Sequence, residues 1–110
     1  MIARTVVSAL EEKKGEDILL IDIHDISDFT DYFVICTGTS DRMLQALADS
    51  VREKVKTNHG ENGHLEGGSG DGWLLLDFGG VVVHLFSPER RGYYRLEELW
   101  SKGKVLLRLQ

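Results

Sequence analysis

A pair of glycines between two apolar runs restricts the fold of this chain more than any other feature. The runs cover residues 73–78 and 81–86, and Gly79 and Gly80 separate them. Aromatic and β-branched runs joined by a two-residue glycine turn predict a β-hairpin. If Phe78 faces Val81 across this turn, the register of the whole hairpin follows. The facing pairs are then Asp77 with Val82, Leu75 with His84, and Trp73 with Phe86.

Because side chains alternate between the two sides of a strand, this hairpin has two different faces. One face is wholly apolar and is expected in the core; it contains Leu74, Leu76, Phe78, Val81, Val83 and Leu85. The opposite face, which we call the mixed face, contains Trp73, Leu75, Asp77, Val82, His84 and Phe86. Large rings beside two polar groups are typical of a protein interface. The alternative is a helix of the same chain covering this face, and the register brings Asp77 within hydrogen-bonding reach of the diagonal His84.

The segment before the hairpin predicts two helices and two strands. Residues 2–13 have the apolar spacing of an amphipathic helix, and Gly15 is able to end it in the left-handed conformation. Residues 18–23 are nearly all apolar and predict a strand buried on both faces; turn residues join it to a second strand over 32–37. Ser40 is expected to cap a helix over 41–56. The buried stripe of that helix is Leu44, Leu47, Ala48, Val51 and Val55.

The segments that flank the hairpin are less regular. Six of the 12 glycines lie between Gly60 and Gly72, in a stretch too poor in apolar residues to pack, so flexible linkage is the favoured interpretation. Strand pairing around residues 64–66 is the alternative. After the hairpin, Ser87 and the following proline predict a capped helical turn. A last helical segment is expected around residues 96–100, followed by a short apolar tail over 105–109.

Length and charge limit the classes of function. The 110 residues, 42% of them hydrophobic, predict one compact domain over residues 1–110. A formal net charge of −5 repels phosphate backbones and favours a basic partner. Cys36 lies inside an apolar run, which fits a reducing cytoplasm. No apolar run approaches the roughly 20 residues that span a bilayer, and the N-terminus lacks an export signal, so we expect a cytoplasmic protein with no membrane role.

Patterns that carry catalysis or metal binding are weak. The four histidines fall in different predicted elements, so no metal site and no cofactor are expected. The turn Gly38-Thr39-Ser40 between a strand and a helix resembles the phosphate-holding turn of nucleotidyltransferases, which is the one enzymatic alternative. Those enzymes also need two carboxylates on the next strand to hold Mg²⁺, and only Asp77 is present there. The small basic cluster of Arg90, Arg91 and Arg95 is compatible with a few ribosomal RNA phosphates, not with autonomous RNA binding.

Several blocks in one order resemble the ribosomal silencing factor family, also called the Iojap family. They are DYFVICTGTSDR at 31–42, EG at 66–67, GWLLLDFG at 72–79, VVVHLF at 81–86, PER at 88–90 and YYRLEELW at 93–100. The resemblance implies an α/β (α+β) fold: a mixed β-sheet flanked by helices, with nucleotidyltransferase-like topology and without the catalytic carboxylates. The chain departs from the family pattern at two positions beside the expected docking surface. Gly80 stands where the family commonly has aspartate, and Ser87 stands where it commonly has histidine.

The same resemblance implies a binding protein that is not an enzyme. Family members dock on the large ribosomal subunit through ribosomal protein fourteen, at the face that meets the small subunit, and repress translation under starvation by impeding subunit joining. The family pattern places the docking surface around the hairpin, and the implied partner-binding residues are Trp73, Leu75, Asp77, His84, Tyr93 and Tyr94. The absence of a targeting peptide points to the bacterial branch.

Three questions stay open at the level of sequence. Organelle relatives act in ribosome assembly, so a large-subunit assembly factor is the alternative function. A nucleotidyltransferase-like enzyme is the less favoured one. We expect a monomer on the ribosome, and the alternative for the free protein is a homodimer in which two copies pair through an apolar sheet face.

Overall fold

A six-stranded mixed sheet organises the chain, in a computed structural model that describes residues 1–93 and 102–109. Its strand order is β3-β4-β5-β2-β1-β6; β2 and β5 run parallel and the other neighbours antiparallel. The predicted α+β class, a mixed sheet with flanking helices, is confirmed. In chain order the elements are α1 (Ile2–Glu12), β1 (Glu16–Asp22), β2 (Tyr32–Thr37), α2 (Asp41–His59), β3 (His64–Gly68), the 3-10 helix η1 (Ser69–Asp71), β4 (Trp73–Asp77), β5 (Val81–Phe86), α3 (Pro88–Tyr93) and β6 (Lys104–Leu109).

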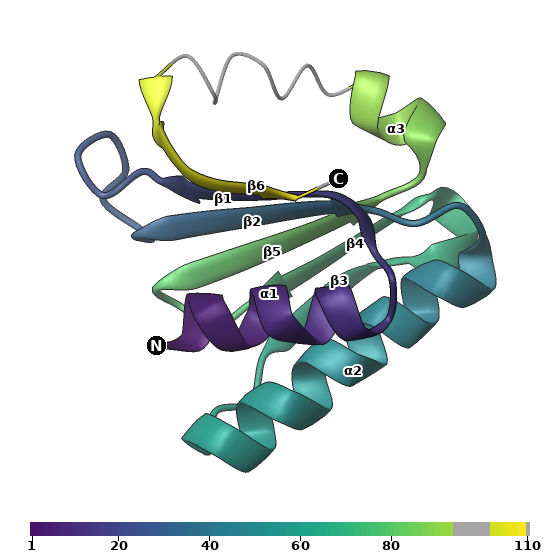
Figure 1. The fold of residues 1–110 in the computed structure, drawn as a ribbon, viewed down its shortest axis with the longest axis horizontal. Coiled ribbons are helices and arrows are strands. Elements are labelled where there is room, and N and C mark those ends of the chain that lie inside the picture. Colours follow the sequence, from purple (N-terminus) through teal and green to yellow (C-terminus); the bar gives the residue numbers. More distant parts are fainter. Residues whose placement is uncertain (94–101, 110) are drawn as a thin grey trace.

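Helices α1 and α2 lie against each other on one side of the sheet, while α3 lies on the other side (Figure 1). Ser40 caps α2 as predicted, because its Oγ accepts the backbone N–H of Met43 at 3.0 Å. The helix continues to His59, three residues beyond the expected end, and Gly60 takes the left-handed cap. The predicted apolar stripe of α2 is fully buried in the main core, which α1 and the apolar face of the hairpin complete.

The hairpin has the predicted register. Phe78 donates its backbone N–H to the carbonyl of Val81 at 2.9 Å, which closes the turn at Gly79 and Gly80. The three facing pairs derived from the turn all occur. The apolar face is buried against α1 and α2, with Phe78 half-buried at its edge. A two-residue turn leaves only one register in which this face is covered, so alternation and turn length together determined the pairing.

The end of α1 differs from the prediction in one residue. Lys14, not Gly15, has the positive φ of 60°. Gly15 serves another purpose, because a Cβ on it would lie 2.4 Å from the Sγ of Cys36 and 3.2 Å from the carbonyl oxygen of Leu10. The glycine therefore allows close approach of the α1–β1 connection to β2, and its missing side chain leaves room for a buried thiol.

Substituting Gly15 tests this packing. Gly15→Ala is expected to lower the free energy of unfolding by about 1–3 kcal/mol, because an added methyl group in a filled core forces its neighbours to shift. Urea unfolding followed by circular dichroism measures the loss. In a Cys36→Ala background the same substitution should cost clearly less, since the nearest obstructing atom is gone; an equal cost in both backgrounds would contradict the assigned contact.

The glycine-rich stretch after α2 is more ordered than the favoured interpretation held. Residues His64–Gly68 form the edge strand β3 and pair antiparallel with β4. Flexible linkage was wrong for this part, and the alternative of strand pairing was right. Two of the glycines there have positive φ and meet neighbours closely: a Cβ on Gly67 would lie 2.5 Å from the carbonyl of Trp73, and one on Gly72 would lie 2.7 Å from Oγ of Ser87. These glycines serve close packing rather than flexibility.

The apolar tail is also an ordered element. Residues Lys104–Leu109 form β6, which pairs antiparallel with β1 and makes the second edge of the sheet. The predicted helical segment around residues 96–100 lies outside the described residues. In the described part of the chain, no helix is long and apolar enough to cross a membrane.

Candidate protein-docking surface

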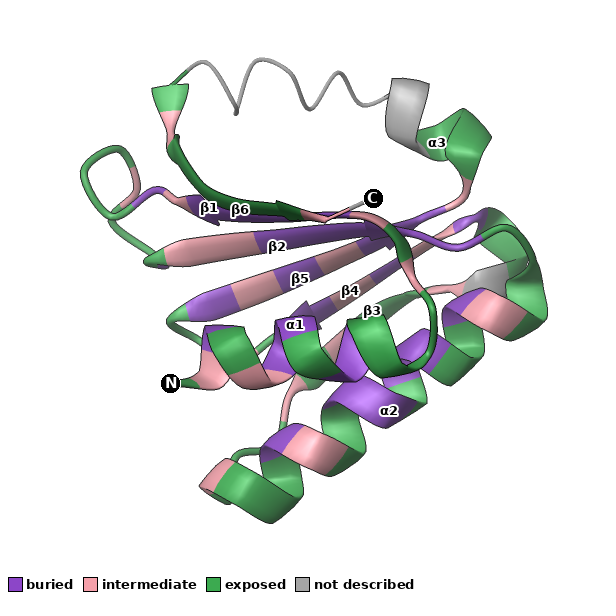
Figure 2. Cartoon of the chain, viewed as in Figure 1, coloured by how far each residue is buried: buried purple, intermediate pink, exposed green. Residues whose placement is uncertain are grey.

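The mixed face of the hairpin stays partly open on the side of the sheet away from α1 and α2. Trp73, Leu75, Val82 and His84 are half-buried and Asp77 is exposed, whereas Phe86 is only 2% exposed. Buried and half-buried residues alternate along β5, as Figure 2 shows. Among the described helices, α1 and α2 pack against the opposite face, and α3 lies on the same side of the sheet as the mixed face (Figure 1). Large side chains of the mixed face are therefore partly accessible to solvent, while the opposite face of the same hairpin packs in the core.

Trp73 stands at the β4 end that is nearest to Phe86. Its indole packs against the smaller of the two core clusters, which consists of Leu19, Ile21, Ile23, Ile35 and Phe86 with Phe33 beside it. Gly67 of β3 lies under the ring, where a Cβ would meet Cε3 at 2.6 Å. The backbone of β3 and the second cluster thus hold the indole in one place while part of it remains accessible. A rigid, half-buried aromatic ring is the usual anchor of a protein interface.

His84 lies between two rings on the mixed face. Its imidazole meets Phe33 edge-on with centroids 5.0 Å apart, and lies parallel to Phe86 with centroids 5.7 Å apart. Burial lowers the pKa of His84 to about 4, so the ring is neutral at pH 7. Among the described residues, Nδ1 of His84 is buried without a hydrogen-bond partner. An apolar side chain would fit this position at lower cost, which argues that the imidazole serves something other than stability.

The hydrogen bond between Asp77 and His84 that the register allowed does not form. Asp77 instead turns back over its own hairpin, where Oδ1 accepts the backbone N–H of Gly79 at 2.8 Å. A local backbone donor two residues away competes well with a side chain on the neighbouring strand, because bonding it fixes fewer torsions. Asp77 therefore stabilises the turn and keeps its second oxygen at the exposed end of the face.

Tyr93 and Tyr94 are placed only in part. Tyr93 is the last residue of α3, whose start is capped as predicted: Oγ of Ser87 accepts the backbone N–H of Arg90 at 3.3 Å. The side chain of Tyr93 and the whole of Tyr94 lie outside the described residues. The structure thus brings Trp73, Leu75, Asp77 and His84 together on one face, and these two tyrosines stay predictions.

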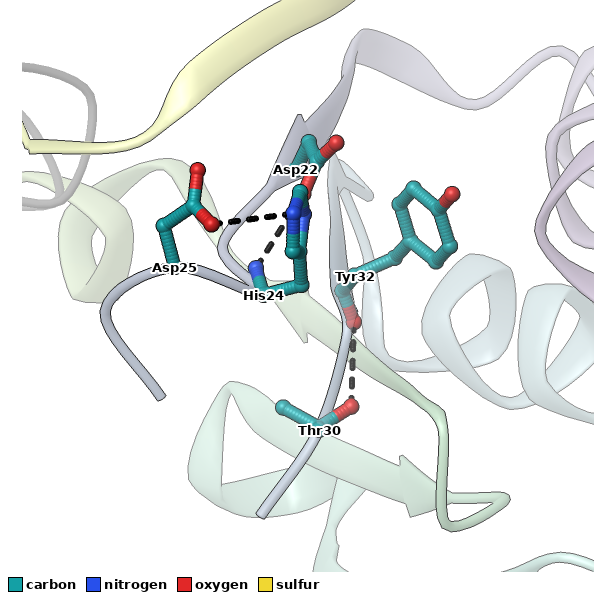
Figure 3. Close-up of polar contacts among 5 residues, drawn as sticks. All are labelled: Asp22, His24, Asp25, Thr30 and Tyr32. Atoms are coloured by element: carbon teal, nitrogen blue, oxygen red, sulfur yellow. Dashed lines mark hydrogen bonds and ion pairs between the residues drawn. The ribbon is translucent and has the colours of Figure 1, made fainter. Parts of the chain in front are cut away.

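Sequence reasoning missed the connector between β1 and β2. Figure 3 shows His24 between two aspartates: Nδ1 lies 2.5 Å from Oδ1 of Asp22, and Nε2 lies 3.0 Å from Oδ1 of Asp25. The hydrogen bond to Asp22 and the two negative charges raise the pKa of His24, and the same bond lowers the pKa of Asp22. Phe29 of this connector is 93% exposed. The available signal was an apolar residue inside a run of turn-forming aspartates, which turn chemistry alone does not explain.

Comparison with known proteins now decides the family. The family model described as "Ribosomal silencing factor during starvation" matches residues 1–109. The chain belongs to the ribosomal silencing factor family. A ribosomal silencing factor from Bacillus subtilis is 40% identical over 104 residues, which cover 94% of this chain and 88% of that protein. The mouse protein named "mitochondrial assembly of ribosomal large subunit protein 1" is 38% identical over 99 residues, covering 87% of this chain and 43% of that protein.

Solved structures agree with this assignment. A crystal structure of a Chromobacterium violaceum protein superposes with a TM-score of 0.85 at 38% identity, covering 91% of this chain and 83% of that one. The backbone at Gly80, where the resemblance implied a departure from the family pattern, joins the hairpin turn to the residues at the start of β2. The carbonyl of Gly80 accepts the N–H groups of Asp31 and Tyr32, and a Cβ on Gly80 would lie 3.6 Å from Oδ2 of Asp31. An aspartate here would place a second carboxylate beside Asp31.

Proposed function

We propose that this ribosomal silencing factor docks through its mixed face on large-subunit ribosomal protein fourteen, at the surface that meets the small subunit, and so prevents the subunits from joining. The observation that carries the proposal is the contrast between the two faces of one hairpin. The face toward α1 and α2 is buried, whereas the mixed face keeps Trp73, Leu75 and His84 half-open. A formal net charge of −5 favours association with a basic ribosomal protein.

We propose that the mechanism is steric and needs no turnover. Once docked, the domain occupies space that the small subunit would fill, with the rings as anchors and the acidic groups facing a basic surface. The polar groups of the turn Gly38-Thr39-Ser40 support binding over catalysis, because Ser40 caps α2 and the hydroxyl of Thr39 lies 3.4 Å from Sδ of Met43. The hydroxyl groups of Thr39 and Ser40 therefore both interact with Met43 of the following helix. Among the described residues, no three metal-binding side chains converge.

Sucrose-gradient sedimentation of purified subunits tests the proposal. With the protein present, small and large subunits are expected to remain separate under conditions in which they otherwise associate, and the protein should co-migrate with the large subunit. We expect this action in the bacterial cytoplasm, by a monomer on the ribosome; a homodimer of the free protein would compete with docking and raise the concentration needed. Subunits that still associate at saturating protein would overturn the proposal.

A role in large-subunit assembly is the second candidate, favoured by the name of the mouse relative. It predicts that cells depleted of the protein accumulate large-subunit precursors. Silencing without an assembly role predicts mature large subunits and unregulated subunit joining after depletion. Profiles of ribosomal particles from depleted cells separate these outcomes.

A further inference from the structure

The connector over residues 24–31, which we call the aspartate loop, displays two apolar side chains to solvent. Phe29 is 93% exposed and Ile26 is 49% exposed. The fold gains almost nothing from Phe29, because a ring in water neither fills the core nor covers a neighbour. An aromatic side chain that contributes so little to folding is a candidate contact for a partner.

The aspartate loop holds Phe29 out in a defined shape. The carbonyl of Ile23 accepts the N–H groups of Ile26 and Ser27 at 3.0 and 2.9 Å, and Oγ of Ser27 accepts those of Phe29 and Thr30 at 3.2 and 3.3 Å. The ring thus projects from backbone that is already ordered by hydrogen bonds. Little further ordering is needed on binding, which lowers the entropic cost of using this ring as an anchor.

This loop adjoins the mixed face. Asp31 and Tyr32 donate their N–H groups to the carbonyl of Gly80, at 2.9 and 3.0 Å. Gly80 belongs to the hairpin turn that Asp77 stabilises, and Asp77 and Val82 are the facing pair of the mixed face nearest to that turn. The loop and the face are therefore joined through one turn, and a partner that covers the Asp77 end of the face comes next to the loop.

The charge around Phe29 indicates the chemistry of the partner. Between Lys14 and Arg42 the sequence has no lysine or arginine and seven aspartates or glutamates. Three of these acids, Asp25, Asp28 and Asp31, are exposed in the aspartate loop itself. An exposed aromatic ring in a loop that also exposes three carboxylates suits an arginine or lysine side chain, whose stem or guanidinium packs on the ring while its charge meets a carboxylate. Nucleic acid is disfavoured at the same place by repulsion of its phosphates.

We infer that the aspartate loop is a second docking element for the basic ribosomal protein, with Phe29 as its apolar anchor and the exposed carboxylates of the loop as partners for its cationic side chains. The inference rests on the proposed function, since it assigns further contacts to the same complex. Trp73 and Phe29 would then mark the two ends of one continuous docking surface that runs from the far end of β4, across the mixed face, to the loop.

The test measures the affinity of fluorescently labelled protein for purified large subunits and for isolated ribosomal protein fourteen. Phe29→Ala is expected to weaken both interactions about tenfold or more, as for an interface anchor. Asp28→Asn should weaken them less, mainly through slower association, and should reduce the dependence on salt. The matched control is Leu106→Ala, which also truncates an exposed apolar side chain, 43% exposed, on the edge strand β6. Because Phe29 is so exposed, its variant should unfold at the same temperature as the wild type.

The outcomes separate the inference from the proposed function. Wild-type protein that binds neither large subunits nor protein fourteen would overturn both. If the wild type binds and Phe29→Ala binds as strongly as the control Leu106→Ala, the inference alone is overturned. Weaker binding of Phe29→Ala to the whole subunit but not to protein fourteen would assign the loop to another ribosomal component, and so would overturn its assignment to this partner.

Discussion

Replacing Trp73 with alanine is expected to weaken docking on the large subunit by about 2 kcal/mol or more, roughly 30-fold in affinity. The half-buried indole is fixed by Gly67 beneath it and by the second core cluster beside it, so a partner gains its full contact area at little entropic cost. Co-sedimentation of large subunits with increasing amounts of wild-type or variant protein measures the change. In a subunit-joining assay the variant should need correspondingly higher concentrations to keep the subunits apart.

Part of the Trp73 ring also supports the fold, so the variant needs two controls. Circular dichroism and thermal unfolding must show that Trp73→Ala is still folded at the assay temperature. Trp73→Leu keeps more of the packing against Phe86 while removing the aromatic ring, and it should still lose most of the affinity. Recovery of large subunits equal to that of the wild type, by a folded Trp73→Ala protein, would remove Trp73 from the docking surface.

Replacing His84 with leucine is expected to reduce the loss of folding stability that the protein suffers as the pH falls from 6.5 toward 4. Burial holds the pKa of His84 near 4 in the folded protein, against an ordinary value of 6.5. As pH falls from 6.5 toward 4, the unfolded chain takes up a proton that the folded protein refuses, so stability is lost. The loss from this one group amounts to up to about 3 kcal/mol and levels off below pH 4, where both states are protonated. Leucine cannot take up this proton, so the variant should lose that much less.

Urea unfolding of wild type and His84→Leu at pH 7, 5.5 and 4.5 measures the difference between the two profiles. At pH 7 the variant should be as stable as the wild type or more so, because it removes a buried nitrogen that has no partner among the described residues. His64→Leu is the matched control, since it makes the same substitution at a histidine whose side chain is 73% exposed. Parallel profiles for His84→Leu would contradict the burial assigned to the ring. A more stable variant that docks less well would show that the imidazole is retained for binding.

The candidate surface could be predicted from sequence only where one hairpin determines it. Trp73, Leu75, Asp77 and His84 share a face because they alternate along two strands whose register the turn sets. The partner of Asp77 could not be predicted in the same way, because the diagonal histidine and the local N–H of Gly79 are both within reach of its carboxylate. Phe29 gave no periodic signal at all, since a loop has no period that would separate a displayed ring from a buried one.

Only the tertiary structure decided what lies at the edges of the sheet. The strands β3 and β6 have little apolar alternation of their own, and they form because β4 and β1 offer unpaired backbone groups that they can satisfy. The sequence by itself determined the elements whose apolar pattern matches a buried face: the hairpin, the strands β1 and β2, and the stripe of α2. A local pattern specifies burial when the apolar periodicity lies entirely within one short segment. Pairing between distant segments, and the approach of Gly15 to Cys36, depends on which neighbours the finished fold brings within reach.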